Sequence, residues 1–217
     1  MAVFSLTTTR RDGHLRNPKT LARFLKHQRW PLSIATGEQV HRSKIAIVPA
    51  LSSARTYAGV DGLITDVARQ PLGIFTADCV PLFMASKDGV VVGVLHAGWR
   101  GVRGGILRQA VRRIKKRWNI PAAQLRAWTG PFIQSCCFDV RWDVARYFPQ
   151  ARRRSKDRWT VDLGRALERQ AKALGVRWMA AGNKRCTRHD ARWHSYRRDQ
   201  TADRQISLIM KTAPVVQ

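Results

Sequence analysis

Five short apolar segments between residues 44 and 97 constrain the fold of this chain more than any other feature of its sequence. Each is rich in Val, Ile, Leu or Phe and is bounded by Gly, Pro or Asp, which is typical of β-strands. Asp88-Gly89, between the last two segments, predicts a hairpin turn because this pair accepts the positive φ that such turns need. The predicted strands cover residues 44–48, 60–65, 71–77, 80–85 and 90–97.

The helical signals lie mainly in the second half of the chain. Apolar residues recur at helical spacing between Val102 and Trp118, while Arg and Lys occupy the opposite face. Shorter helices are expected over residues 19–28, 143–148 and 162–174, and late strands over residues 177–182 and 205–210. A block of strands followed by mixed helices and strands predicts an α+β fold with mixed sheets.

Length and residue usage favour a folded protein in a reducing compartment. A chain of 217 residues with 44% apolar side chains can bury a sizeable core. No apolar run approaches the roughly 18–20 residues that span a bilayer, and the N-terminus lacks the pattern of a secretory signal. The four cysteines include no CxxC pair, so they are expected to be reduced thiols. We therefore expect a cytoplasmic protein without a membrane partner.

The net charge of +26 is the unusual global property of the chain, and 27 of its 40 Lys and Arg lie in residues 101–217. Such a charge would concentrate phosphates, nucleotides or nucleic acid near the surface. A basic, solvated surface without a specific partner is the alternative explanation. Because no nucleic-acid-binding motif is present, a nucleic-acid partner is not expected, although the charge permits non-specific binding.

Three side chains that can bind metals stand at the ends of predicted strands: His41, Cys79 and His96. Two imidazoles and one thiolate suit Zn²⁺ and can also hold copper, and three protein ligands leave a fourth position for water or substrate. Each residue also has a simpler explanation, as a packed core thiol or a hydrogen-bonded structural histidine. Their separations of 38 and 17 residues match no local zinc motif.

Several short motifs, taken in order, resemble one known family. They are QVH (39–41), TADC (76–79), HAGWRG (96–101), GPFIQSCCFDV (130–140) and SYRRD (195–199). Together they resemble the YfiH-type laccase-domain family, also called multicopper polyphenol oxidoreductase, over residues 38–210. The resemblance implies a single domain over residues 1–217 with stacked α/β/β/α layers. It also implies that His41, Cys79 and His96 bind a catalytic zinc, with copper as the alternative metal.

The resemblance further implies phosphorolysis of purine nucleosides, with nucleoside and phosphate as substrates. Adenosine deamination and methylthioadenosine phosphorolysis are the implied companion activities. The catalytic candidates within the matching motifs are Asp78, Arg100 and Arg10, and the substrate-binding candidates are Arg42, Tyr196 and Arg197. Asp78 is equally well explained as a partner that fixes a histidine tautomer or as a turn residue. A monomer or homodimer is expected.

The chain also departs from the family pattern. Its N-terminal third is short, and Arg42 stands where glycine is common, so the identity of the substrate is less constrained than the metal site. One alternative function is a copper oxidase acting on phenols, although the chain has only six histidines and no His-x-His pair. Another is a peptidoglycan-editing hydrolase with Cys79 as nucleophile and His96 as base. A nucleic-acid-binding module is the non-enzymatic alternative.

The remaining cysteines have no assigned role. Cys136 and Cys137 are interpreted as buried apolar side chains, with ligation of a second metal as the alternative. The spacing of Cys186, His189 and His194 is not interpreted as a metal site, because it is irregular and its surroundings are rich in arginine.

Overall fold

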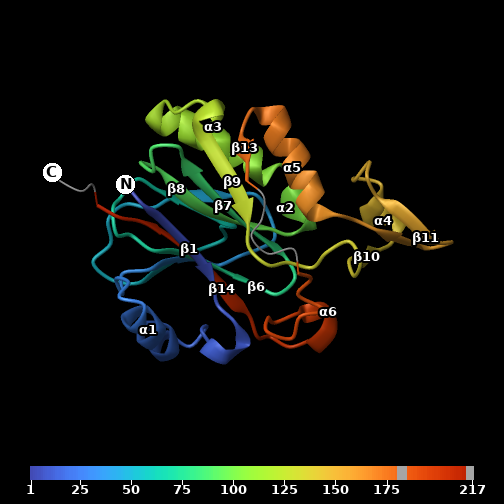
Figure 1. The fold of residues 1–217 in the computed structure, drawn as a ribbon, viewed down its shortest axis with the longest axis horizontal. Helices are drawn as coiled ribbons and strands as arrows, with labels where there is room; N and C mark the ends of the chain where they lie inside the picture. Colours follow the sequence, from blue (N-terminus) through green and yellow to red (C-terminus); the bar gives the residue numbers. More distant parts are fainter. Residues whose placement is uncertain (180–184, 214–217) are drawn as a thin grey trace.

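Two mixed β-sheets lie face to face in the computed structural model, which describes residues 1–179 and 185–213 (Figure 1). Within these residues the first sheet has five strands in the order β1-β14-β6-β2-β4. β2 is parallel to both of its neighbours, whereas β14 is antiparallel to β1 and to β6. The strands are β1 (Val3–Thr7), β14 (Gln205–Lys211), β6 (Leu72–Thr76), β2 (Ala35–Gly37) and β4 (Arg55–Tyr57).

The second sheet has six described strands in the order β13-β9-β7-β8-β5-β3. Its outer pairs, β13 with β9 and β3 with β5, are parallel, and its inner pairs are antiparallel. A small antiparallel sheet, β10-β12-β11, projects from one end of the molecule (Figure 1). These strands are β13 (Arg177–Trp178), β9 (Leu125–Thr129), β7 (Val80–Ser86), β8 (Val92–Ala97), β5 (Gly62–Thr65), β3 (Ile45–Ile47), β10 (Asp139–Val140), β12 (Arg158–Thr160) and β11 (Arg152–Ser155).

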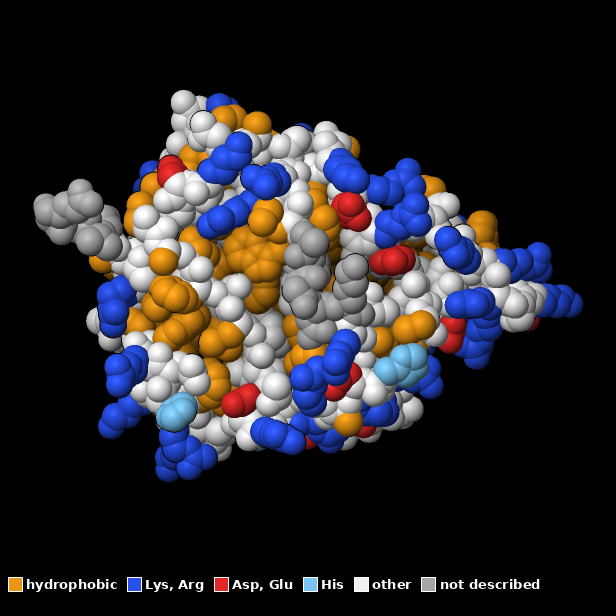
Figure 2. Space-filling view, viewed as in Figure 1, with side chains coloured by type: hydrophobic (Ala, Val, Ile, Leu, Met, Phe, Trp, Pro, Cys, Tyr) orange, Lys and Arg blue, Asp and Glu red, His pale blue; other side chains and the backbone are white. Residues whose placement is uncertain are grey.

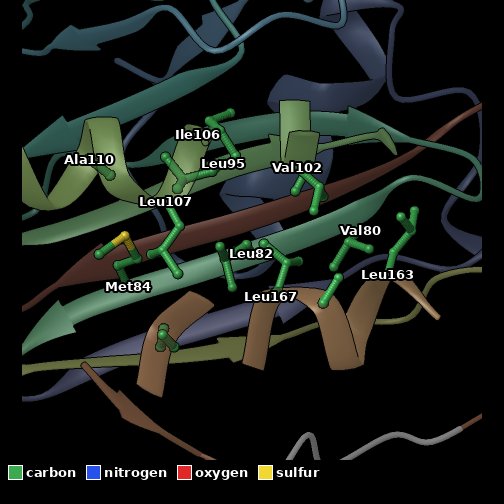
Figure 3. Close-up of a cluster of buried hydrophobic side chains, with 14 of the residues drawn as sticks. Val80, Leu82, Met84, Leu95, Val102, Ile106, Leu107, Ala110, Leu163 and Leu167 are labelled. Atoms are coloured by element: carbon green, nitrogen blue, oxygen red, sulfur yellow. The ribbon is translucent and has the colours of Figure 1, made fainter. Parts of the chain in front are cut away.

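Helices cover the outer faces of both large sheets. The α-helices are α1 (Pro18–His27), α2 (Trp99–Arg103), α3 (Ile106–Trp118), α4 (Trp142–Ala145), α5 (Leu163–Leu174) and α6 (Tyr196–Asp199), and the 3-10 helices are η1 (Arg10–Asp12) and η2 (Ala122–Gln124). Leu107 of α3 and Leu167 of α5 pack with Leu82 of the six-stranded sheet (Figure 3). On the other side, Leu25 of α1 packs with Leu208 of the five-stranded sheet. The expected α/β/β/α layers of a single α+β domain are therefore confirmed.

The central strands form as predicted because both faces of each strand are buried, which favours apolar side chains at successive positions. Every residue of β7 and β8 is buried, since one face meets the helices and the other meets the second sheet. The hairpin between them turns at Asp88-Gly89, and Gly89 adopts the positive φ of +74° that the pair predicts. α5 also agrees with its prediction, because the Asp162 side chain accepts a hydrogen bond at its start and Gly175 ends it in the left-handed conformation.

Two predicted helices differ from the structure. The helix expected over residues 102–118 is two helices, because the Gly104-Gly105 pair interrupts it and Gly105 adopts a φ of +70°. The helix expected over residues 143–148 is the four-residue α4, which ends at Ala145. Pro149 disfavours a helical conformation at Phe148, the residue before it, so the helix does not extend to that position. The strand expected over residues 177–182 is two residues long in β13, and residues 180–182 lie outside the described part of the chain.

The described residues contain no helix that is both long and apolar enough to cross a membrane. Basic side chains are spread over the face shown in Figure 2 and gather at the projecting three-stranded sheet. That sheet carries Arg152, Arg153 and Arg154 in β11, all of them exposed. On this face the positive charge is thus a general property of the surface rather than a single groove.

Leu82 tests the packing between the six-stranded sheet and its helices. It is fully buried in a central strand, so Leu82→Ala should lower the free energy of unfolding by about 3 kcal/mol through lost contacts and a residual cavity. The matched control Leu32→Ala removes a side chain that is 51% exposed and should cost less than about 0.5 kcal/mol in the same urea titration. Equal losses in the two variants would contradict this packing.

Candidate metal centre and active-site cavity

Three side chains of metal-binding types meet at one end of the strands of the six-stranded sheet. His96 lies near the end of β8, Cys79 directly precedes β7, and His41 lies in the segment before β3. These positions lie at the same end of the sheet. β7 and β5 both run antiparallel to β8, and β3 is parallel to β5, so β7, β5 and β3 begin where β8 ends. The ligand atoms of the three residues lie within 4.8 Å of one another, and the two imidazole rings meet edge to face at 4.7 Å.

Asp61 holds this cluster together, and its only signal in the sequence is a polar residue at the start of a predicted strand. Its side chain is completely buried. Oδ1 lies 2.8 Å from His96 Nδ1, and the Asp61 carbonyl oxygen accepts a hydrogen bond of 2.7 Å from the His96 backbone N–H. A proton on Nδ1 donated to this carboxylate leaves His96 Nε2 free to bind a metal.

The same carboxylate fixes the segment that carries His41. It accepts backbone N–H bonds from Val40, His41 and Arg42 at 3.3, 2.9 and 2.7 Å. These bonds support the left-handed conformation of His41, whose φ of +57° is uncommon for a residue with a side chain. Gln39 attaches the start of the segment to β6, since its amide group exchanges two hydrogen bonds with the backbone of Phe75 at 2.6 and 2.8 Å.

Gly98 leaves the space in which the three ligands converge. A Cβ atom at this position would lie 3.0 Å from Cys79 Sγ and 3.4 Å from His41 Cδ2. The first glycine of the HAGWRG motif is therefore explained by the close approach of the ligands to the backbone.

The pKa values of Cys79 and His96 are shifted by their neighbours in the cluster. Burial alone would raise the pKa of Cys79, but the charge of His96 and hydrogen bonds to both histidines lower it to about 6. Burial alone would lower the pKa of His96, but the Cys79 sulfur and the hydrogen bond to Asp61 raise it to about 9. The surroundings therefore favour a thiolate at Cys79, which is the form that binds metals.

The cluster opens into a cavity of about 510 Å³, within the usual size range of small-molecule sites. Four arginines line it, and each guanidinium group lies over an aromatic ring of the same wall, at 4.4 to 5.7 Å from the ring centre. The pairs are Arg16 with Phe75, Arg100 with Trp99, Arg197 with Phe138, and Arg204 with Tyr196. The cavity therefore combines positive charge with flat apolar surfaces.

Asp78 is the one carboxylate among the described residues that line this cavity. Its Oδ1 accepts a hydrogen bond from the Thr187 hydroxyl and its Oδ2 accepts one from the Arg197 backbone N–H, both at 2.6 Å. Asp78 therefore ties the segment that carries Arg197 to the loop that carries Cys79. Its backbone has a φ of +81°, so it also forms the turn between β6 and β7.

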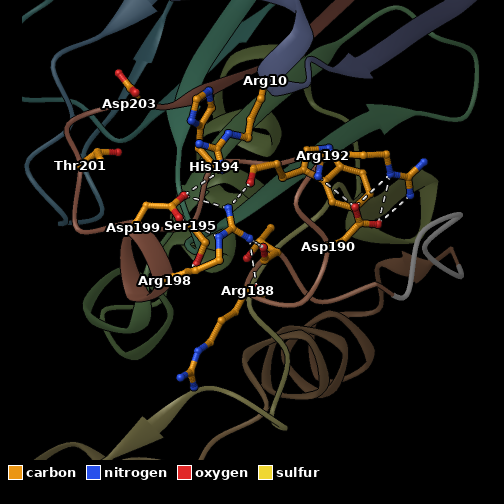
Figure 4. A network of polar contacts seen from close by, with 12 residues as sticks. Arg10, Arg188, Asp190, Arg192, His194, Ser195, Arg198, Asp199, Thr201 and Asp203 are labelled. Atoms are coloured by element: carbon orange, nitrogen blue, oxygen red, sulfur yellow. Dashed lines mark hydrogen bonds and ion pairs between the residues drawn. The ribbon is translucent and has the colours of Figure 1, made fainter.

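The structure brings most, but not all, of the candidate residues together. His41, Cys79, His96, Asp78, Arg100, Tyr196 and Arg197 all line the cavity. Arg10 is not in its lining, and instead pairs with Asp199 of α6 at 3.3 Å (Figure 4). Arg42 lines a separate depression beside α3. The positions of these two residues give no support to direct contact with a substrate.

Two cavity arginines had no candidate role from the sequence. Arg16 lies in a segment without a recognisable motif, whereas Arg204 follows SYRRD in the tail that resembles the family; only the fold brings both to the cavity. Burial lowers the pKa of Arg204, and the nearby charge of Arg16 lowers it further. Two guanidinium groups held close together favour a bound anion between them.

A sequence model of the multi-copper polyphenol oxidoreductase laccase family matches residues 4–212 of the chain. The chain belongs to this family. The family assignment confirms the resemblance that the QVH, TADC and HAGWRG motifs indicate.

Relatives of this laccase-family chain include proteins named purine nucleoside phosphorylase. One from Streptomyces coelicolor is 33% identical over 186 residues, which are 82% of this chain and 75% of the relative. YlmD from Geobacillus stearothermophilus is 32% identical over 220 residues, covering 92% and 79% of the two chains. The crystal structure of YlmD has a TM-score of 0.82 over 90% of this chain and 80% of its own, at 31% identity. A Neisseria meningitidis protein reaches a TM-score of 0.85 over 97% and 95%, at 26% identity.

The described residues of this laccase-family chain contain two groups of side chains that could hold a metal ion. The first is the His41, Cys79 and His96 cluster, where a buried carboxylate orients one imidazole and Gly98 leaves room for the ligands. The second consists of Cys136, Cys137, Cys186 and His189. The interpretation of Cys136 as a buried residue is wrong, since its side chain is exposed, whereas Cys137 and Cys186 are buried.

Asp61 provides a test of the first cluster. Asp61→Asn removes the charge that orients His96 and holds residues 40–42, so the affinity for zinc should fall by about 10- to 100-fold. Competition with a chromophoric chelator measures this affinity. Asp88→Asn, in the distant hairpin turn, changes the same functional group and should leave the affinity unchanged. An unaltered affinity in Asp61→Asn would show that the cluster does not depend on this carboxylate.

Proposed function

We propose that this chain is a zinc-dependent purine nucleoside phosphorylase, which converts adenosine, inosine or guanosine and inorganic phosphate into free base and ribose 1-phosphate. The proposal depends on one observation above all: a three-ligand cluster opens into a cavity where four arginines lie over aromatic rings. The names of the relatives from Streptomyces coelicolor and Geobacillus stearothermophilus support it. Adenosine deamination and methylthioadenosine phosphorolysis are proposed as companion reactions in the same cavity.

The arginines supply the phosphate site of this proposal. A guanidinium group presents paired N–H donors that match two oxygens of a phosphate. Both oxygens of Asp78, the carboxylate in the described lining, already accept hydrogen bonds within the protein. A bound dianion would therefore meet several cations and little competing negative charge.

The aromatic rings supply a site for the purine. Tyr196 is 56% exposed at the cavity, and Trp99 and Phe138 lie on other parts of the wall. Flat apolar rings bury a heterocyclic base by stacking, with centroid separations of about 4.5–7 Å. Arginines that lie over these rings are held by cation–π attraction, which reduces the cost of ordering them when a substrate binds.

In the reaction a phosphate oxygen forms a bond to C1′ of the ribose while the bond from C1′ to the purine nitrogen breaks. The purine leaves with the bonding electrons and takes up a proton. The chain's own residues hold the phosphate and the base in position, and Asp78 positions Arg197 through the backbone hydrogen bond. A zinc ion held by His41, Cys79 and His96 would supply an electrophilic centre with one position for water or substrate.

A cysteine-dependent hydrolase is the second candidate function, because Cys79 also lies beside two imidazoles. In that reaction the Cys79 sulfur would attack a carbonyl carbon and His96 would transfer the proton to the leaving group. This candidate needs neither phosphate nor metal, which separates it experimentally from the phosphorylase.

Incubation of the purified protein with inosine and phosphate should release hypoxanthine and ribose 1-phosphate, as measured by chromatography. Turnover should require both phosphate and the metal. Cys79→Ala should lose the metal of this cluster together with turnover, because it removes one of the cluster's three ligands. Turnover that persists after chelation or without phosphate would contradict the phosphorylase proposal. An inactive Cys79→Ala variant with the same metal content as the wild type would favour the hydrolase.

Arg100 and Arg103 form a matched pair on helix α2 for testing the phosphate site. Both side chains are exposed, but only Arg100 lines the cavity, whereas Arg103 lies over the Tyr147 ring. Arg100→Gln should raise the KM for phosphate by about 10- to 100-fold, the usual cost of a lost charge-assisted hydrogen bond. Arg103→Gln should leave the KM within about twofold. Similar values for both variants would remove Arg100 from the phosphate site.

A further inference from the structure

Two short turns that are distant in sequence bring three cysteines and a histidine together outside the active-site cavity. The first turn spans residues 134–138, where the backbone N–H groups of Cys137 and Phe138 both donate to the Gln134 carbonyl. The second spans residues 186–190, where those of His189 and Asp190 donate to the Cys186 carbonyl. An isolated parallel bridge between Phe132 and Cys186 joins the two segments.

The side chains of these turns point toward a common centre. Cys136 Sγ lies 3.7 Å from Cys137 Sγ, and His189 Nδ1 lies 3.8 and 4.0 Å from these two sulfurs. One ligand atom from each of the four residues lies within 4.8 Å of the others. Zinc–sulfur bonds of about 2.3 Å in a tetrahedron place two sulfurs about 3.8 Å apart, so the observed separations fit four ligands around one ion.

We propose that Cys136, Cys137, Cys186 and His189 form a second metal site, a closed Cys₃His centre for Zn²⁺ that is separate from the His41, Cys79 and His96 cluster. Four protein ligands leave no position for substrate, which is the arrangement of a structural zinc. The proposal does not depend on the phosphorylase activity, because none of these four residues lines the active-site cavity.

The charge around this site suits a thiolate-bound metal. Three thiolates and one Zn²⁺ carry a net charge of −1, so neighbouring arginines such as Arg188 attract the loaded centre rather than repel it. The Cys186 sulfur also accepts a hydrogen bond from the Gln134 backbone N–H at 3.4 Å. Backbone donors directed at a ligand sulfur stabilise its ionised form and orient it for the metal.

The metal would hold together two chain segments that form one wall of the active-site cavity. Ile133, directly before the first turn, and Phe138, its last residue, line the cavity. The second turn leads to α6, which carries Tyr196 and Arg197 into the same cavity. Thr187, next to Cys186, donates to the Asp78 carboxylate. The site thus joins two segments whose inner sides meet at the substrate position.

Zinc content per chain tests the proposal in protein that has been loaded with zinc under reducing conditions and separated from free metal. Cys186→Ser should bind one zinc fewer than the wild type, whether or not the first cluster is loaded. Cys79→Ser should lose the other zinc, and the double variant should bind none. Ser135→Ala, in the same turn as Cys136 and Cys137 but outside the four ligands, should match the wild type.

A cobalt spectrum provides a readout independent of zinc content. Cobalt-loaded Cys79→Ser protein should show sulfur-to-cobalt charge transfer and the intense visible bands of a tetrahedral site, and the exposed-ligand variant Cys136→Ser should weaken them. The melting temperature of Cys186→Ser should fall by at least about 5 °C. Equal zinc content in Cys186→Ser and wild type would overturn the proposal. A disulfide between Cys136 and Cys137 that persists after zinc loading under reducing conditions, as detected by mass spectrometry, would also overturn it.

Discussion

The buried carboxylate of Asp61 provides the interactions on which the candidate metal centre depends. A fully buried carboxylate is costly unless several donors surround it, and here three backbone N–H groups and one imidazole do so. Its pKa is lowered because the hydrogen bonds from His96 and from the backbone of Arg42 and His41 outweigh the effect of burial. One charge therefore fixes both the strand that carries His96 and the segment that carries His41.

The sequence was sufficient to predict the central sheet and to single out the three side chains that meet at its strand ends, but not the way they are held. β7 and β8 are continuous apolar runs, so their burial on two faces followed from composition alone. β1, β2 and β4 lie in a segment without clear periodicity, and they form because neighbouring strands provide partners. β9 does alternate, with Leu125, Ala127 and Thr129 buried, and this pattern was missed among the basic residues. Asp61 could not be identified, because only the tertiary fold brings its partners near, namely three backbone N–H groups and the His96 imidazole.

The arginines illustrate a different limit of sequence analysis. In a chain with 40 basic residues, the position of an arginine within a motif is weak evidence for function. Arg100 and Arg197 reach the cavity, whereas Arg10 pairs with Asp199 and Arg42 lies beside α3. Arg198 shows the structural use of such residues, since it donates to the carbonyls of Thr187, Arg188 and Trp193 and so holds the segment before α6 (Figure 4). Similar side chains in one motif thus either line the cavity or hold a loop in place.

The pairing of β7 with β8 links the candidate metal site to the folding of the chain. Val80 lies opposite Ala97 and Pro81 opposite His96, which brings Cys79 next to Gly98. A shift of this pairing by one residue would turn one of the two ligands to the opposite face of the sheet. An ion that needs both side chains would then bind only molecules in which the hairpin has formed correctly. Under the proposed function, metal capture during synthesis would therefore stabilise properly aligned molecules over misaligned ones.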